Sequence, residues 1–228
     1  MTRNLRVVAI LGGTFDPTHY GHLRLAADVM TALSLTEVRL VPAGVPPHRL
    51  PPVASGEDRF AMTALGCAEF RGLAADRCEV DRPGPSYSVA TLESLHAAQP
   101  RVPLALILGS DAFRGLTKWW QWERLFALAH FIVVERPGAA PTGAELAPEL
   151  LVHWQRRLTT DTARLERTLA GSILRVPVMP QSIAAREIRA ELALGRVDRV
   201  RGLLPAAVLD YIERNHLYRS GPDASRQG

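Results

Sequence analysis

An apolar run over residues 7–11 is followed at once by a glycine pair and then by a segment of helical periodicity. A buried strand that leads through Gly12 and Gly13 into a helix is the start of a βα unit. At such a turn the glycines let a ligand approach the backbone, and the free N–H groups and dipole of the helix favour an anion. His19 and His22 stand at the expected helix start, where their ring N–H groups can point at the same anion. The segment therefore predicts a phosphate site.

The glycine-histidine segment also allows plainer interpretations. A Gly-Gly turn is most often only a turn, and the segment matches neither a P-loop nor a GxGxxG fingerprint. Two histidines can indicate a metal, but HxGH lacks the i, i+4 spacing of HExxH, and no cysteine or carboxylate cluster is near it in the sequence. We therefore expect no metal site built from protein side chains.

Strand-like and helix-like runs alternate along the rest of the chain, which is typical of a parallel sheet covered on both faces. The pattern predicts an α/β fold with a doubly wound parallel sheet and C-terminal helices. Strands are expected over residues 7–11, 38–41, 78–80, 103–108, 131–134 and 173–176. Helices are expected over residues 23–33, 60–68 (after an N-cap pair of Ser55 and Asp58), 89–95, 184–194 and 206–215. Ligands of such sheets gather beyond the carboxyl ends of the strands, where the glycine turn lies.

The length of 228 residues favours one domain, which we place over residues 1–219. Residues 139–171 are less regular and arginine-rich, so we expect an insertion or a loosely attached helical segment there, with its arginines forming a solvated face. The polar tail over residues 220–228 is expected to be disordered.

The formal charge of +4 comes almost entirely from arginine, because Lys118 is the only lysine. This modest excess is spread along the chain, unlike the dense basic stripe of a nucleic-acid-binding protein, and it suits a small anionic substrate. Cys67 and Cys78 fit no metal spacing and are expected to be reduced. The first apolar run is too short for a signal peptide and no segment has the length of a membrane span, so a cytoplasmic protein without a membrane partner is expected.

The segment GGTFDPTHYGHL over residues 12–23 resembles the signature of the HxGH nucleotidyltransferase superfamily. Within this superfamily, the sequence of the segment is most similar to that of the bacterial nicotinate-nucleotide adenylyltransferases. Four further segments are similar to the same family and follow in its order, so the resemblance covers about residues 6–219. It implies a Rossmann-like nucleotidyltransferase domain whose substrates are ATP and nicotinate mononucleotide, in NAD biosynthesis.

The resemblance assigns the phosphate chemistry to His19, His22 and Arg189. It implies that ATP is contacted by a wider set of residues, namely Gly12, Gly13, Thr14, Phe15, Gly109, Asp111 and Arg186. Mg²⁺ is implied as a cofactor that is bound mainly through the phosphates of ATP.

The resemblance places another set of residues around the mononucleotide, namely Asp16, His48, Ser88, Trp119, Trp120 and Arg136. Ser88 stands where the family usually has a threonine that helps to bind the nicotinate carboxylate, and serine keeps the hydroxyl that this implied role needs. Trp119 and Trp120 would frame the pyridine ring by stacking and by backbone N–H contacts. The plainer alternatives are an ordinary proline-rich loop around His48, helix capping by Ser86 or Ser88, and a packed aromatic corner at the tryptophans.

The chain departs from the family in its last motif. The family commonly has ISSTxxR at a helix start, where hydroxyl groups and the arginine hold the triphosphate. Here Ala184 and Ala185 stand for the serines and Arg186 stands for the threonine, while Arg189 keeps the arginine. Backbone N–H groups at the helix start survive this change, and Arg186 could supply charge that the hydroxyls do not.

The implied reaction is adenylyl transfer, in which the 5′-phosphate of the mononucleotide attacks the α-phosphorus of ATP and pyrophosphate leaves. The nucleophile is already an anion, so no general base is needed, and catalysis comes from alignment and charge stabilisation. The alternatives are a related nucleotidyltransferase that prefers nicotinamide mononucleotide or another phosphate acceptor, and a catalytically inactive nucleotide sensor. A monomer and a homodimer are both compatible with the sequence.

If Arg186 compensates for the lost hydroxyl groups, Arg186→Ala raises the KM for ATP, because one charged donor to the triphosphate is removed. Steady-state kinetics at varied ATP concentration measure this. If Ser182 or Gln181 reaches the triphosphate instead, or if Arg186 is only a solvent-exposed side chain, the ATP kinetics stay unchanged and the compensating role is excluded.

Overall fold

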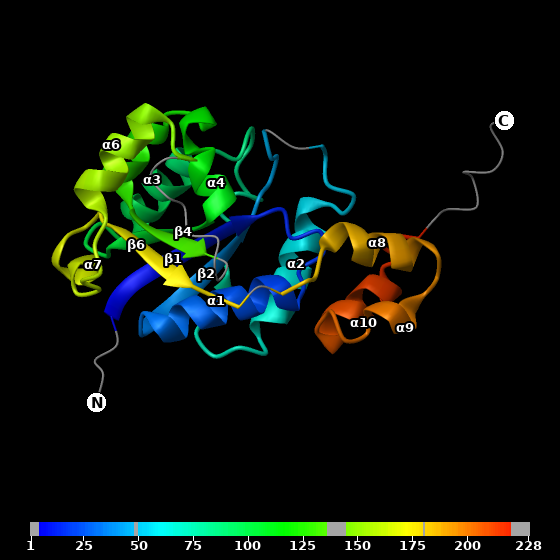
Figure 1. The fold of residues 1–228 in the computed structure, drawn as a ribbon. Coiled ribbons are helices and arrows are strands. Elements are labelled where there is room, and N and C mark those ends of the chain that lie inside the picture. The colour runs from blue at the N-terminus through cyan, green and yellow to red at the C-terminus, as the bar shows by residue number, and fades with distance from the viewer. Residues whose placement is uncertain (1–4, 48–49, 136–144, 180, 220–228) are drawn as a thin grey trace.

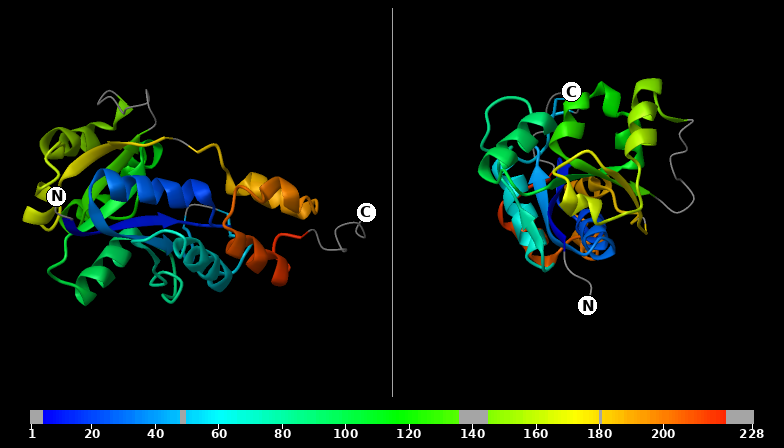
Figure 2. Two further views of the ribbon diagram at one scale, coloured as in Figure 1. Left: turned by 90° about the horizontal axis from the view of Figure 1, so that it is seen from below. Right: turned by 90° about the vertical axis from the view of Figure 1, so that its left-hand side faces the viewer.

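The computed structural model describes residues 5–47, 50–135, 145–179 and 181–219. These residues form a six-stranded parallel sheet in the order β3-β2-β1-β4-β5-β6, with helices on both faces (Figures 1 and 2). The strands are β1 (Leu5–Gly13), β2 (Leu35–Pro42), β3 (Leu73–Ala75), β4 (Leu104–Gly109), β5 (His130–Glu135) and β6 (Ile173–Pro177). The predicted doubly wound α/β fold is confirmed.

The helices connect and follow these strands. They are α1 (Tyr20–Ala32), α2 (Gly56–Cys67), α3 (Ser88–Ala98), α4 (Ser110–Arg114), α5 (Leu125–Leu128), α6 (Pro148–Arg157), α7 (Arg164–Arg167), α8 (Ala185–Ala193), α9 (Val197–Val200) and α10 (Ala206–Arg214), with 3-10 turns η1 (Leu116–Lys118) and η2 (Trp122–Arg124). Across the described parts of the chain, none of them is long and apolar enough to cross a membrane.

Alternate side chains of the strands enter two apolar clusters, one on each face of the sheet. Val7 and Ala9 of β1 lie in the cluster that contains α1 and α7. Val8 and Ile10 lie in the cluster that contains α3, α4, α5 and α6. Because both faces are covered, the strands have continuous apolar sequences instead of alternating ones, which is why the sequence reveals most of them.

A third apolar cluster joins the C-terminal helices α8, α9 and α10 to α2. Figures 1 and 2 show these helices grouped at one end of the molecule, beyond the sheet and next to α2. Met62 of α2 and Ile188 of α8 are both fully buried in this cluster. Helix α8 ends before Gly195, whose φ of +71° is the left-handed conformation that favours glycine. The two predicted C-terminal helices are confirmed, whereas the short α9 was not predicted.

The strand predicted over residues 78–80 is wrong, because these residues form a turn. The Cys78 N–H donates to the Asp76 carboxylate at 3.0 Å, a local bond that is typical of turns. The edge strand of the sheet is β3, slightly upstream, where Leu73 pairs with Val38 of β2. Its sequence, Leu-Ala-Ala, carries no β-branched or aromatic residue, so propensity gave no signal for it.

Of the two alternatives for residues 139–171, loose attachment is wrong for the part that the structure describes, residues 145–171, while an insertion stays a prediction. Leu150 and Trp154 of α6 are buried in the same cluster as α3, and Leu165 of α7 is fully buried against the other face. The described arginines of this segment are exposed as predicted, except Arg157, which is half-buried and donates to the Gly171 oxygen at 3.2 Å. The predicted disordered tail over residues 220–228 lies outside the described residues.

The packing of α7 is testable with one leucine inside the helix and one just after it. Leu165→Ala is expected to lower the free energy of unfolding by about 2–5 kcal/mol, because it leaves a cavity in the core. Leu169→Ala, at a side chain that is 51% exposed, is expected to change it by less than about 0.5 kcal/mol. Urea denaturation followed by circular dichroism measures both. Equally small effects would restore the prediction of loose attachment.

Candidate active site at the carboxyl edge of the sheet

The order of the strands reverses between β1 and β4. From β1 the chain winds outward to β2 and β3, and then returns past β1 to β4, β5 and β6. Ligands of doubly wound sheets bind in the crevice outside the carboxyl ends of the strands at this point. Ile10 of β1 pairs with Leu106 of β4, so Gly12 and Gly109 follow at the same edge. A Cβ added to either glycine would meet nothing within 4 Å, so open space lies next to both strand ends.

The turn after β1 is shaped by packing within the chain. A Cβ on Gly13 would lie 2.8 Å from the ring of Phe15, so only glycine fits there. Phe15 has a φ of +49°, and its ring is buried in the core. Phe15 can therefore meet a ligand through its backbone but not through its ring. Thr14 is partly exposed at the same turn.

The two histidines form a stacked pair at the start of α1. His19 is the N-cap residue, and its Nδ1 accepts a hydrogen bond from the Gly21 N–H at 3.1 Å. The proton of the neutral ring is therefore on Nε2. The rings of His19 and His22 stack with centroids 3.7 Å apart, and Phe15 meets His22 edge-on at 4.9 Å. A Cβ on Gly21 would lie 2.9 Å from the His19 ring, which explains the glycine between the histidines.

Burial lowers the pKa of His19 from its ordinary value to about 4. Near neutral pH, His19 therefore offers a neutral Nε2–H donor. An anion placed against this ring would favour the charged form and raise the pKa again.

Arg189 reaches the same turn from the other end of the chain. Its Nη1 donates to the backbone oxygen of Asp16 at 2.5 Å and lies 3.8 Å from the Asp16 carboxylate. The Asp16 carboxylate itself is buried and accepts hydrogen bonds from the N–H groups of Val53 (2.8 Å) and Ala54 (3.2 Å) and from the Tyr218 hydroxyl (2.6 Å). Asp16 thus has internal partners, whereas Arg189 stands beside the histidine turn.

The loop after β2 is joined to the start of α3 by Ser86. Its hydroxyl accepts from the N–H groups of Gly44 (2.9 Å) and Val45 (3.2 Å), and its own N–H donates to the Val45 oxygen (2.8 Å). The N-cap residue of α3 is Tyr87, with no side-chain hydrogen bond at the cap. The interpretation of Ser86 or Ser88 as the helix cap is therefore wrong, because Ser86 bonds the loop instead.

The tryptophans divide into packed and exposed ones. Trp119 and Trp122 are partly buried against the core, and Trp122 meets Phe126 edge-on. Trp120 is 46% exposed and lies against Tyr87, with ring centroids 4.9 Å apart. The aromatic-corner interpretation thus describes Trp122, whereas Trp120 presents its ring at the start of α3.

The structure describes two of the four remaining predicted site residues. Ser88 is the first residue of α3, directly after Tyr87. Asp111 is exposed in the first turn of α4 and forms an ion pair with Arg114. His48 and Arg136 lie outside the described residues.

Comparison with known proteins supplies the family. A family model described as cytidylyltransferase-like matches residues 10–188. A protein of Halorhodospira halophila named "probable nicotinate-nucleotide adenylyltransferase" is 46% identical over 208 residues, which cover 91% of this chain and 93% of the relative. A protein of the same name from Aeromonas salmonicida is 42% identical over 213 residues, with 93% and 97% covered. The chain belongs to the nicotinate-nucleotide adenylyltransferase family.

The fold of this family member also resembles a solved structure. The nicotinic acid mononucleotide adenylyltransferase of Plasmodium falciparum, complexed with NaAD, aligns with a TM-score of 0.69 at 16% sequence identity. The alignment covers 93% of this chain and 97% of the other. At this identity the likeness concerns the fold, and it agrees with the Rossmann-like fold that the sequence resemblance implied.

The departure from the adenylyltransferase pattern lies at the start of α8. Ala184 is the N-cap residue, and no side chain caps this helix. Ile183 lies beside the histidine turn, since a Cβ on Gly21 would be 3.6 Å from the Ile183 Cβ. Arg186 is 82% exposed and lies 3.7 Å from Glu187. The start of α8 thus reaches the site, and the compensating role of Arg186 stays a prediction.

Three residues of this adenylyltransferase lie at the site without having been singled out from the sequence, namely Arg59, Tyr87 and Tyr218. For Arg59 the sequence did hold a signal. It stands three residues before Met62 on the same face of α2, and both side chains are fully buried. A charged residue on the apolar face of a helix needs buried partners. Tyr87 and Tyr218 act through contacts to distant segments, for which the sequence has no local pattern.

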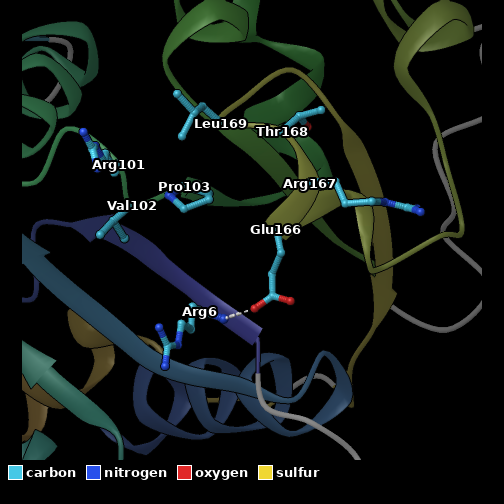
Figure 3. A pocket seen from close by; sticks show the side chains of 8 residues that line it. All are labelled: Arg6, Arg101, Val102, Pro103, Glu166, Arg167, Thr168 and Leu169. Carbon is cyan, nitrogen blue, oxygen red and sulfur yellow. Dashed lines mark hydrogen bonds between the residues drawn. The ribbon is translucent and has the colours of Figure 1, made fainter.

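One pocket of about 400 Å³ lies at the opposite edge of the sheet (Figure 3). It is lined near the start of β1 and β4 by Arg6, Arg101 and Pro103, with Glu166 accepting a hydrogen bond from the Arg6 N–H. It is therefore separate from the crevice at the carboxyl ends. Among the described residues, no three His, Cys, Asp or Glu side chains gather into a group that could hold a metal ion.

The burial of His19 predicts a pH dependence of stability. Because its pKa is about 4 in the folded chain and about 6.5 when unfolded, the unfolded state takes up the proton first as the pH falls. Stability is therefore lost progressively between about pH 6.5 and pH 4. His19→Asn keeps a capping group that does not titrate, so the variant is expected to lose less stability over this range. Urea unfolding at a series of pH values measures the difference. Parallel curves for the two proteins would contradict the shift.

Proposed function

We propose that this family member transfers the adenylyl group of ATP to nicotinate mononucleotide, giving deamido-NAD and pyrophosphate. The stacked pair of His19 and His22 carries the proposal, because it lies beside two open glycines at the reversal point of the sheet. The nature of the acceptor rests on the family, whose members with 42% and 46% identity bear that name.

The chemistry needs alignment more than proton transfer. An oxygen of the mononucleotide 5′-phosphate forms a bond to the α-phosphorus of ATP, and the bond from that phosphorus to the bridging oxygen of pyrophosphate breaks. Both reactants are anions, so their repulsion must be overcome and the developing charge stabilised. The site meets this demand with N–H donors on rigid elements.

On the ATP side, the backbone at Gly12 and Gly13 lies against the triphosphate, with the N–H groups of Thr14 and Phe15 close by. The Nε2–H of His19 and the ring of His22 donate to the phosphates, and Arg189 stabilises the leaving pyrophosphate. Gly109, the last residue of β4, and Asp111, in the first turn of α4, face the nucleotide from the neighbouring strand. Loss of one donor to the transition state typically costs roughly 10²–10³ in rate.

On the mononucleotide side, Trp120 and Tyr87 offer exposed ring surface for the pyridine ring, and Ser88 offers a hydroxyl to its carboxylate. The backbone N–H of Trp119 donates to the Leu116 oxygen at 2.9 Å, so we assign Trp119 no N–H contact to the substrate. His48 and Arg136 lie outside the described residues, and their assignment to the mononucleotide rests on the family resemblance alone. The contribution of Asp16 is indirect, because its carboxylate is occupied by internal donors.

ATP enters as its magnesium complex. No group of three metal-binding side chains occurs in the part of the chain that the structure describes. We place the ion on phosphate oxygens and water, as is usual for Mg²⁺ on nucleotide phosphates. We place the reaction in the cytoplasm, because Cys67 and Cys78 are free thiols, as expected in a reducing compartment.

The deciding experiment is pyrophosphate release from ATP and magnesium with nicotinate mononucleotide, nicotinamide mononucleotide or pantetheine phosphate as acceptor. Release that is fastest with nicotinate mononucleotide supports the proposal. Preference for another acceptor would reassign the substrate, and nucleotide binding without any release would identify a sensor.

His22→Ala is expected to lower kcat by roughly 10²–10³ while changing the KM for ATP much less, because His22 acts mainly on the transition state. His216→Asn is a suitable control, since His216 is exposed in a C-terminal turn and asparagine tolerates its φ of +54°. Steady-state kinetics measure both. A kcat for His22→Ala within a few-fold of the wild-type value would exclude His22 as the transition-state donor.

A further inference from the structure

We propose that Arg59 is a positioning residue for adenylyl transfer, which fixes the loop on the ATP side relative to the loop on the mononucleotide side. The inference rests on the proposed function, because the two loops are assigned to their substrates by it. Arg59 touches neither substrate in this proposal. It acts through backbone oxygens of both loops.

The contacts of Arg59 are unusual for an arginine. The residue is 1% exposed, and its guanidinium donates to four backbone oxygens. Nη1 donates to Thr14 (2.9 Å) and Ala43 (2.5 Å). Nη2 donates to Gly44 (3.1 Å), and Nε donates to Ala54 (3.2 Å). One side chain on α2 thus holds the turn after β1 and both ends of the loop between β2 and α2.

The guanidinium suits this task because it is planar and presents five N–H donors in a fixed arrangement. A lysine has one ammonium group and cannot span carbonyl oxygens on both loops in this way. Burial lowers the pKa of Arg59, while the nearby Asp16 charge acts in the opposite direction. Neutral oxygens and a neighbouring carboxylate together make the buried charge tolerable.

The two loops lead directly to the two halves of the site. Thr14 lies in the turn that carries the glycine pair and the histidines, so its backbone sets the place of the triphosphate. Gly44 is bonded to Ser86, which precedes Tyr87 and Ser88 at the mononucleotide side. A Cβ on Gly44 would lie 2.2 Å from the backbone oxygen of Glu79, so this loop has little room to shift.

A second link joins the same loops. The Ala43 N–H donates to the Gly13 oxygen at 2.8 Å, so the loops meet directly where Arg59 bonds them. The positions of Thr14 and Gly44 are therefore coupled through one guanidinium. A misplacement of about 1 Å between reacting groups can lower the rate by roughly 10². Loss of this link should therefore slow adenylyl transfer, which needs both substrates in place, more than it weakens the binding of either substrate alone.

The test compares Arg59→Lys with Arg77→Lys. Arg77 is exposed and also bonds α2, through Glu57, so it controls for the loss of an arginine contact to that helix. We measure kcat by pyrophosphate release, the Kd of ATP and of nicotinate mononucleotide each alone by calorimetry, and the melting temperature. For Arg59→Lys we expect kcat to fall by about 10–10² with each Kd within about threefold of the wild-type value. For Arg77→Lys we expect no such fall.

An unchanged kcat in folded Arg59→Lys would overturn the inference. A rise in the Kd of one substrate by the same factor as the fall in kcat would also overturn it. If Arg59→Lys does not fold, Ser86→Ala loosens the same loop at its other attachment. It should then lower kcat with the single-substrate affinities kept, and an unchanged kcat there would again overturn the inference. A wild-type chain that releases no pyrophosphate would overturn the proposed function and this inference together, whereas an active wild type with unaffected variants overturns the inference alone.

Discussion

The arrangement of the candidate site at the carboxyl edge of the sheet depends on one buried group, the carboxylate of Asp16. A carboxylate removed from water is costly unless donors surround it. Its donors here are Val53, Ala54 and Tyr218. The first two are neighbours in the sequence, but both are far from Asp16 and from Tyr218. Burial and the bond to Asp16 both raise the pKa of Tyr218, so its hydroxyl keeps its proton and stays a donor. The charge is therefore satisfied only when the turn after β1, the loop before α2 and the C-terminal segment meet.

This meeting of three segments places the histidine pair. The Tyr20 N–H donates to the Leu203 oxygen at 3.0 Å, and Ile183 lies against Gly21, so C-terminal residues enclose the start of α1. The enclosure removes water from His19 and lowers its pKa, and its hydrogen bond from Gly21 fixes the donor nitrogen. A neutral donor held in this way needs no rearrangement when charge develops on a phosphate. His19 is thus uncharged near neutral pH, but its Nε2–H donor is held in a fixed direction.

The sequence revealed the features that depend on local pattern. Continuous apolar runs marked the strands buried on both faces, and the glycine and histidine spacing marked the turn at the end of β1. The failures have physical causes of their own. Strand β3 lacks residues of high β-propensity, and the packing of α6 and α7 depends on partners that periodicity does not identify. Arg59 and Tyr218 escaped because their roles consist of contacts across 45 and 202 residues of chain, for Thr14 and Asp16 respectively.

Donors that are fixed by the backbone explain how the site can tolerate alanines at the start of α8. The hydroxyl groups of the family pattern would act from flexible side chains, whereas the backbone N–H groups of the helix start keep their direction whatever the side chain. Arg189 is held on the Asp16 backbone oxygen by one of its five N–H donors, so its guanidinium stands beside the histidine turn before any phosphate arrives. Its remaining donors can face the leaving pyrophosphate without the entropy cost of ordering a free side chain. Under the proposed function, binding of the triphosphate therefore depends on Arg189, positioned by the Asp16 backbone oxygen, more than on the hydroxyl groups that the alanines replace.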